Sequence, residues 1–197
     1  MKRTKFYAVA LGLMLAGTIS AQKWSVGKDL SYLKGQTAIC LKYTYDNLIT
    51  ADKKPEATYV KEKVEKLNKK ESGKGDAWAK SWVDNRAAKD EPKFELLFNK
   101  AAETIQGTKD KAGTKYTIIV HCTKIDPGYN IGVSHKPAVC DFEFTIVESA
   151  NPTKVLSKGV LPKMATPFGL GFDFMAIEEC FAKAGKKLGK SIGKAIK

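Results

Sequence analysis

The chain has 197 residues, of which 34 are Lys or Arg and 21 are Asp or Glu, so its formal net charge is +13. With 43% hydrophobic residues, it is too apolar for a disordered tail and long enough for one domain with its own core. Beyond the N-terminal segment, no apolar run approaches the roughly 20 residues that a membrane-spanning helix needs. Any contact with a membrane should therefore be made from its surface.

Residues 1–21 have the charge and hydropathy pattern of an export signal. Basic residues precede a short apolar stretch, and small residues close the segment at Ser20 and Ala21. We therefore expect a signal peptide over 1–21 and a single α+β domain over 22–197. No Cys lies near the expected cut, which argues against lipid modification. The mature chain should be exported, periplasmic or secreted, and not lipid-anchored.

Alternation of apolar and polar residues from Thr37 to Tyr45 predicts a strand. The next part of the chain has helical spacing instead. It predicts an amphipathic helix after Pro55, a second helix from Gly75 and a third that begins near Pro92. Proline suits the first turn of a helix, because that position leaves its N–H group unpaired. We expect three separate helices here.

The second half of the chain returns to strand periodicity. It predicts strands over 116–123 and 140–146, a weaker strand over 154–161, a loop over 162–171 and a final helix from about Phe174. This order predicts an α+β fold, with a mixed, mostly antiparallel sheet of three to four strands packed with about four helices in a two-layer sandwich. The long helical excursion allows the first strand to pair in parallel with a later one.

The predicted second and third helices carry a specific pattern of residues. It runs Gly75-Asp76-x-Trp78-x-x-x-Trp82-x-x-x-Arg86, followed by Pro92-x-Phe94-x-x-x-Phe98-Asn99-Lys100. The pattern resembles that of an uncharacterised family of small exported proteins from bacteria with outer membranes. The resemblance implies export and the same α+β order, and it implies no activity. The fold order is also similar to small periplasmic domains that assist envelope assembly, which is an analogy of fold.

Trp78, Trp82 and Arg86 follow one another at intervals of one helical turn and are candidate binding residues. In one interpretation the two indole rings form an aromatic platform for a sugar or a base. In the other they anchor the helix in the core, with Arg86 stacked over Trp82 as a cation–π pair. The sequence leaves both interpretations open.

Motifs of several enzyme classes are absent from the sequence: His-Glu-x-x-His, Cys-x-x-Cys and the phosphate loop Gly-x-x-x-x-Gly-Lys. His121 and His135 could approach across a turn near Cys122 and Asp126, as in a metal site. The simpler interpretation is a pair of strand or loop histidines, so we expect no metal and no cofactor. With two histidines in the chain, acid–base catalysis would have to depend on carboxylates.

The last predicted helix has a basic side and a glycine edge. The candidate binding residues on its basic side are Lys183, Lys186, Lys187, Lys190 and Lys194. Glycine recurs at positions 185, 189 and 193, and each glycine costs about 1 kcal/mol of helix propensity relative to alanine. We therefore expect another element to pack against the glycine edge. The basic side could equally be a solvated face or dock on an anionic surface.

The cysteines allow one disulfide hypothesis. Cys122 and Cys140 share the inward phase of two strands that we expect to be antiparallel neighbours, and an exported compartment permits oxidation. The alternative is that both are buried free thiols. Cys40 faces the other way on its strand and Cys180 flanks the apolar stripe of the last helix, so we expect these two to be unpaired.

Together these features predict a non-enzymatic exported protein that binds or assists assembly at the cell envelope. Its expected partners are anionic envelope components or another envelope protein. We do not expect nucleic acid as a partner, because no binding module for it is present. The alternative is a small secreted hydrolase or inhibitor with a carboxylate-based or loop-based site.

Overall fold

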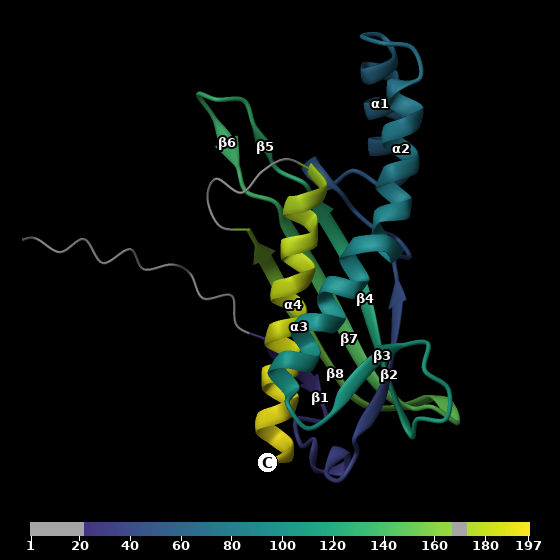
Figure 1. Ribbon diagram of the computed structural model, residues 1–197, viewed down its shortest axis with the longest axis vertical. Coiled ribbons are helices and arrows are strands. Elements are labelled where there is room, and N and C mark those ends of the chain that lie inside the picture. The colour runs from purple at the N-terminus through teal and green to yellow at the C-terminus, as the bar shows by residue number, and fades with distance from the viewer. Residues whose placement is uncertain (1–21, 167–172) are drawn as a thin grey trace, which may run out of the picture.

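The computed structural model of the protein describes residues 22–166 and 173–197. The predicted signal peptide over 1–21 lies outside the described residues and stays a prediction. Figure 1 shows a layer of helices in front of a sheet, a helical hairpin that extends past one end of the sheet, and a small β-hairpin that projects beside it.

In the described part of the chain, six strands form one mixed sheet in the order β1-β8-β7-β4-β2-β3. Their bounds are Lys23–Val26 (β1), Ala38–Thr44 (β2), Gln106–Lys109 (β3), Tyr116–Asp126 (β4), Val139–Glu148 (β7) and Asn151–Ala165 (β8). β2 pairs in parallel with β3 and β4, and the other neighbours pair antiparallel. The first predicted strand, over 37–45, corresponds to β2, and the prediction that it pairs in parallel with a later strand is confirmed. A separate hairpin is formed by β5 (Tyr129–Asn130) and β6 (His135–Lys136).

The predicted sheet of three to four strands is wrong, because two edge strands lack apolar alternation. β1 is largely exposed, and β3 has the sequence Gln-Gly-Thr-Lys, in which Gly107 is the buried position. Backbone pairing with β8 and β2 creates these strands, and hydrophobic periodicity does not detect it. β8 also continues to Ala165, into the segment predicted as a loop.

The helices are α1 (Glu56–Asn68), α2 (Lys74–Asn85), α3 (Glu91–Ala102) and α4 (Asp173–Ile196), with short 3₁₀ turns at Ser31–Leu33 (η1) and Ala51–Lys53 (η2). A π-helical turn at Arg86–Asp90 (η3) joins α2 to α3 without a break.

The π turn corrects the predicted helix count. Glu91 donates its N–H group to the carbonyl of Arg86, five residues earlier. Pro92 has no N–H group to donate, and the wide turn before it lets the helix continue past it. The prediction of about four helices is therefore wrong. The described residues contain three long helices, and Pro92 lies inside one of them.

The core lies between the sheet and the layer formed by α3 and α4 (Figure 1). Phe94 and Phe98 of α3 are fully buried. Phe181 of α4 meets Phe142 of β7 edge to face, with 4.8 Å between ring centroids. None of the helices in the described residues combines the length and the apolar character that crossing a bilayer requires.

The glycine edge of α4 packs against the backbone of α3. A Cβ atom on Gly185 would collide with the carbonyl oxygen of Phe94, and one on Gly189 with that of Phe98. At Gly193 it would lie 2.8 Å from the carbonyl oxygen of Ala102. The expectation that another element packs against the glycines is confirmed, and the partner is α3.

We expect Gly185→Ala and Gly189→Ala to lower the free energy of unfolding by about 2 kcal/mol, and Gly193→Ala to lower it less. The added methyl group forces the helices apart, and this outweighs the gain of about 1 kcal/mol in helix propensity. Urea denaturation measures the difference, with Lys190→Ala on the exposed side of the same helix as control. Unchanged stability of Gly185→Ala would contradict the close contact.

Candidate functional site

Several polar and charged residues gather around the π turn, on the side that faces α1, β2 and α4. We call this group the π-turn cluster: Tyr45, Glu56, Arg86, Asp90 and Glu91. A π turn inside an α-helix is frequently found at functional sites, so this cluster is the first candidate for a site.

Arg86 is held by two contacts in the cluster. Its guanidinium pairs with the carboxylate of Glu56 and lies over the ring of Tyr45, 4.3 Å from the ring centroid. Glu56 also accepts a hydrogen bond of 2.5 Å from the indole nitrogen of Trp82. One of the two interpretations had Arg86 stacked over Trp82; in the structure the guanidinium lies over Tyr45 instead, and Glu56 of α1 binds both Arg86 and Trp82.

Trp78 and Trp82 are used in packing. Trp82 is 4% exposed, and its ring centroid lies 5.3 Å from that of Trp78. Trp78 in turn stacks on Phe174 of α4 at 6.3 Å and meets Tyr59 of α1 at 6.0 Å. The rings therefore join the helical hairpin to α4, and this arrangement favours the anchoring interpretation over an open platform.

Glu91 is a buried carboxylate with two partners. It accepts a hydrogen bond of 3.0 Å from the hydroxyl of Tyr45 and pairs with the ammonium group of Lys109 at 2.5 Å. Burial, followed by the charge of Glu91, raises the pKa of Tyr45 above its usual range, so the phenol stays protonated. The hydrogen bond to Glu91 raises the pKa of Lys109. The carboxylate of Glu91 is thus held between a hydroxyl and an ammonium group.

Asp90 is the exceptional residue of the cluster. It is 4% exposed, and its Oδ1 atom has no hydrogen-bond partner among the described residues. Burial raises its pKa to about 8, and the negative charge of Glu178 on α4 contributes to this, while Arg86 opposes it. At neutral pH the carboxyl is therefore mostly protonated and able to hold a proton inside the fold.

Two hollows flank the cluster. One, of about 290 Å³, is lined by Glu91, Pro92, Glu95, Leu96, Asn99 and Lys109. The other, of about 360 Å³, is lined by Tyr45, Asn47, Leu48, Ile49, Pro55, Glu56 and Ala57. Asp90 lines neither of these two hollows. The contacts described above make the cluster a largely buried network of hydrogen bonds and ion pairs.

The predicted basic side of α4 separates into two groups. Lys183 donates to the carbonyl of Ala165 at the end of β8, and burial, followed by the charge of Lys183, lowers the pKa of Lys187. Lys186, Lys190 and Lys194 are exposed and have no ion-pair partner among residues 22–166 and 173–197. We call these last residues the lysine row.

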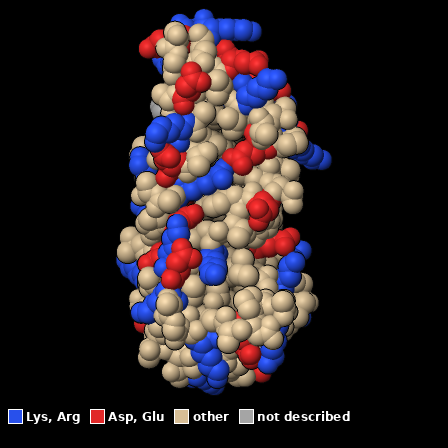
Figure 2. Space-filling model, turned by 90° about the vertical axis from the view of Figure 1, so that its right-hand side faces the viewer, with Lys and Arg blue, Asp and Glu red and all other residues tan. Residues whose placement is uncertain are grey.

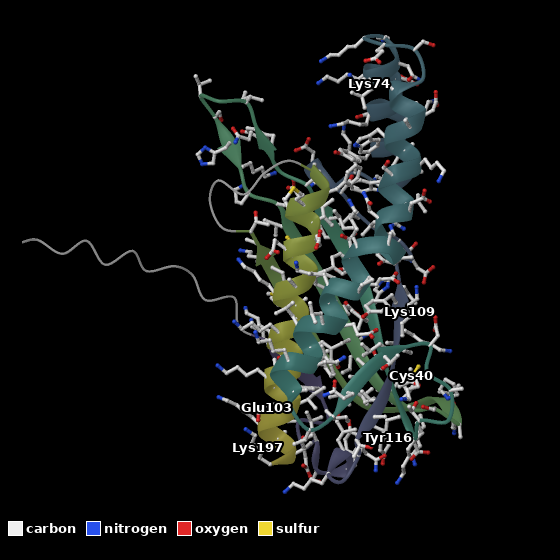
Figure 3. All side chains as sticks on the ribbon, in the orientation of Figure 1. Cys40, Lys74, Glu103, Lys109, Tyr116 and Lys197 are labelled. Carbon is white, nitrogen blue, oxygen red and sulfur yellow. The ribbon has the colours of Figure 1, made fainter. Side chains whose placement is uncertain are left out.

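The charges beside the lysine row are already paired. Lys93 of α3 lies 3.3 Å from Glu178 and 3.7 Å from Glu179. Lys197 pairs with Glu103 at 2.9 Å, where α3 and α4 end side by side (Figure 3). Glu178, Glu179 and Glu103 are therefore engaged by lysines outside the row.

The cysteines do not face one another across the strands in the way that the disulfide hypothesis assumed. Cys122 lies opposite Phe142, and Cys140 lies opposite Ile125. In the described chain the four cysteines are free and buried. Burial raises the pKa of the Cys140 thiol, and a hydrogen bond with Cys180 adds to this. Cys40 lies on the other face of the sheet, beside the segment 110–114.

The histidines and a serine motif offer no alternative site. His121 shares a hydrogen bond of 2.8 Å with Thr44, and His135 belongs to the β5–β6 hairpin. Within the described residues no three His, Cys, Asp or Glu side chains converge as metal ligands do. The pattern Gly-x-Ser-x-Gly occurs at 189–193, but it lies inside α4 and not at the strand-to-helix turn that a nucleophile elbow requires.

Sequence reasoning missed Tyr45, Glu56, Asp90 and Glu91. One signal for Asp90 was present, because it continues the series of Trp78, Trp82 and Arg86 at intervals of four residues. The prediction that a new helix begins near Pro92 ended this series at Arg86, so Asp90 was not recognised as its next member.

Comparison with known proteins gives weak similarities. No protein-family model matches the sequence, and no curated protein matches it. A PelC dodecamer from Paraburkholderia phytofirmans is 10% identical, with a TM-score of 0.41 over 85% of this chain and 96% of that chain. A second PelC dodecamer from this organism, with a Leu-to-Met substitution, is 8% identical, with a TM-score of 0.38 over 83% and 95%. Both of these neighbours are oligomers. Similarity at this level carries no argument about the function of the present chain.

We expect the stability of the protein to fall between about pH 4 and pH 8 through Asp90. In this range the folded state keeps a proton that the unfolded state, with a carboxyl pKa near 3.8, has released. The stability that this proton contributes is fully present below the unfolded pKa and is lost as the pH rises through about 8, with a slope of up to about 1.4 kcal/mol per pH unit.

Asp90→Asn removes this titration, so its stability relative to the unmodified protein should rise steadily from about pH 4 to pH 8 and then level off. Urea denaturation at several pH values measures the difference. Asp84→Asn, at an exposed position of the same helix, is the control and should leave the profile unchanged. Parallel profiles for Asp90→Asn and the unmodified protein would show that Asp90 titrates normally.

Proposed function

We propose that the protein is a non-enzymatic binding module of the cell envelope, and that it docks on an anionic lipid surface through the lysine row of α4. The observation that carries this proposal is the row itself. Lys186, Lys190 and Lys194 recur at every fourth residue on one exposed side of a long helix, and no carboxylate among the described residues pairs with them.

The packing of α4 supports the proposal, because it fixes the direction of the row. The glycine edge lies against α3 and the apolar side against the sheet, so the lysines are left facing water. A cationic side on a helix that is already folded loses little further conformational entropy when it meets a surface. Each lysine near an anionic leaflet contributes about 1 kcal/mol.

The distribution of charge elsewhere also supports a local site. Figure 2 shows the face to the right of Figure 1, on which Lys and Arg are interspersed with Asp and Glu. On and beside α1 and α2, for example, Lys54, Lys74 and Lys80 are paired with Glu62, Glu71 and Asp84. Mixed charges of this kind largely cancel beyond a Debye length of about 8 to 10 Å.

A secreted hydrolase or inhibitor remains the alternative function, and the buried pair Asp90 and Glu91 is the observation that favours it. A carboxylate enzyme needs its acid to face the substrate space. Glu91 lines a hollow but is paired with Lys109, and Asp90 lines neither of the two hollows described. The pairing of Glu91 with Lys109 therefore supports the binding module better.

Changing Lys186, Lys190 and Lys194 together to Gln should weaken binding to vesicles of phosphatidylcholine and phosphatidylglycerol by about 100-fold at low salt. The reason is that three lysines, each contributing about 1 kcal/mol of binding free energy, are lost. Vesicle co-sedimentation measures the change, and thermal unfolding should be unaffected. The matched control changes Lys66, Lys69 and Lys70 to Gln, which removes the same charge from a region with neighbouring acids.

Failure of the unmodified protein to bind such vesicles at low salt would refute the proposal. An equal loss in the control variant would show that net charge, and not the row, attracts the protein to the surface.

Export is part of the same proposal. In its native host the mature protein should begin at Gln22 or within two residues of it, because the small residues at Ser20 and Ala21 form the expected cleavage site. N-terminal sequencing of the purified protein measures this. Recovery of intact Met1 from the cytosolic fraction would contradict it.

A further inference from the structure

The tip of the β5–β6 hairpin exposes more apolar surface than its size would lead one to expect. Val133 is 99% exposed, Ile131 is 68% exposed and Tyr129 is 50% exposed. Among the described residues, Val133 has the largest exposed fraction of any large apolar side chain. The hairpin projects from the end of the sheet, apart from the helical layer (Figure 1). Apolar side chains gathered on a projection are typical of a contact site.

Three successive amides of the tip are paired within the turn. Ile131 donates its N–H group to the carbonyl of Ser134 at 2.9 Å, and Val133 donates to the carbonyl of Ile131 at 3.0 Å. Gly132 donates to the side-chain oxygen of Asn130 at 3.1 Å. An unpaired amide costs several kcal/mol in an apolar medium. These three amides are paired within the turn, so they add no such penalty when the tip leaves water.

The charge and the polarity of the hairpin fit an anionic lipid surface. Residues 127–138 contain no Asp or Glu, so no carboxylate of the hairpin is repelled by anionic headgroups. At its base Lys136 pairs with the buried Asp126 at 2.6 Å, which ties the hairpin to β4. The hydroxyl of Tyr129 lies 3.4 Å from that of Ser134. A tyrosine below an apolar tip suits the headgroup level, where its ring and hydroxyl meet different surroundings.

We propose that the hairpin tip inserts into an anionic lipid bilayer, with Ile131 and Val133 entering the apolar layer and Tyr129 at the headgroup level. This inference rests on the proposed function for the attraction to an anionic surface, and it identifies that surface as a bilayer. A narrow turn presents its apolar atoms on several sides, and fluid lipid can surround it. A protein partner would need a matching groove.

The test places an environment-sensitive fluorophore at the tip through Val133→Cys. The native cysteines are buried, so the new thiol reacts first in the folded protein. On vesicles of phosphatidylcholine and phosphatidylglycerol the fluorophore's emission should shift to the blue. It should also be quenched by lipids that carry a spin label at a shallow depth in the bilayer. The same label at Lys70→Cys, an exposed position between α1 and α2, is the control and should stay in water.

A second variant tests the contribution of the apolar side chains. Ile131→Ser combined with Val133→Ser should weaken vesicle binding by about tenfold or more, because it removes apolar surface that the lipid would cover. Thermal unfolding should not change, since both side chains are exposed.

The outcomes distinguish insertion of the hairpin tip from docking through the lysine row. If the bound protein keeps its tip label in water, insertion is refuted and docking through the row stands. If the lysine-row variant binds and still inserts its tip, insertion stands and the proposed role of the row fails. If no vesicle recruits the protein, both are refuted.

Discussion

The close approach of α3 and α4 is the contact on which the rest of the structure depends. Backbone meets backbone where Gly185 and Gly189 face Phe94 and Phe98. Contact this close forms one helical layer, which then covers the sheet with aromatic side chains. It also determines which sides of α4 are left over for water. The lysine row is thus a product of core packing, since each of its lysines directly follows a glycine in the sequence and the contact of the glycine edge with α3 sets the rotation of the helix.

The π turn gives the same long helix two different tasks. Before it, Trp78 and Trp82 of α2 pack against α1 and α4. After it, Phe94 and Phe98 pack into the main core. One turn of altered period changes the direction in which the apolar side of a helix faces. The turn also leaves Asp90 buried with an unpaired oxygen, a destabilising arrangement that the surrounding packing must offset.

The sequence identified features that depend on side-chain periodicity and missed those that depend on backbone contacts. The central strands, the apolar stripe of α4 and its glycine edge could be predicted, because each leaves a regular pattern of residue types. β3 could not, since a Gln-Gly-Thr-Lys strand exists only through its pairing with β2. For the candidate site, Trp82 and Arg86 were found by spacing. Glu56 and Tyr45 come from distant segments, and only the fold brings them to Arg86.

Because the cysteines lie on both faces of the sheet, the opening of each face can be followed separately by thiol modification. Cys40 lies beside the segment 110–114 on one face, whereas Cys122 and Cys140 belong to the core on the face that α4 covers. A buried thiol reacts with a reagent only when the structure around it opens. The rates at which Cys40 and Cys140 become modified therefore report two different opening motions. The rate at Cys40 measures the movement of a surface loop, and the rate at Cys140 measures the separation of α4 from the sheet.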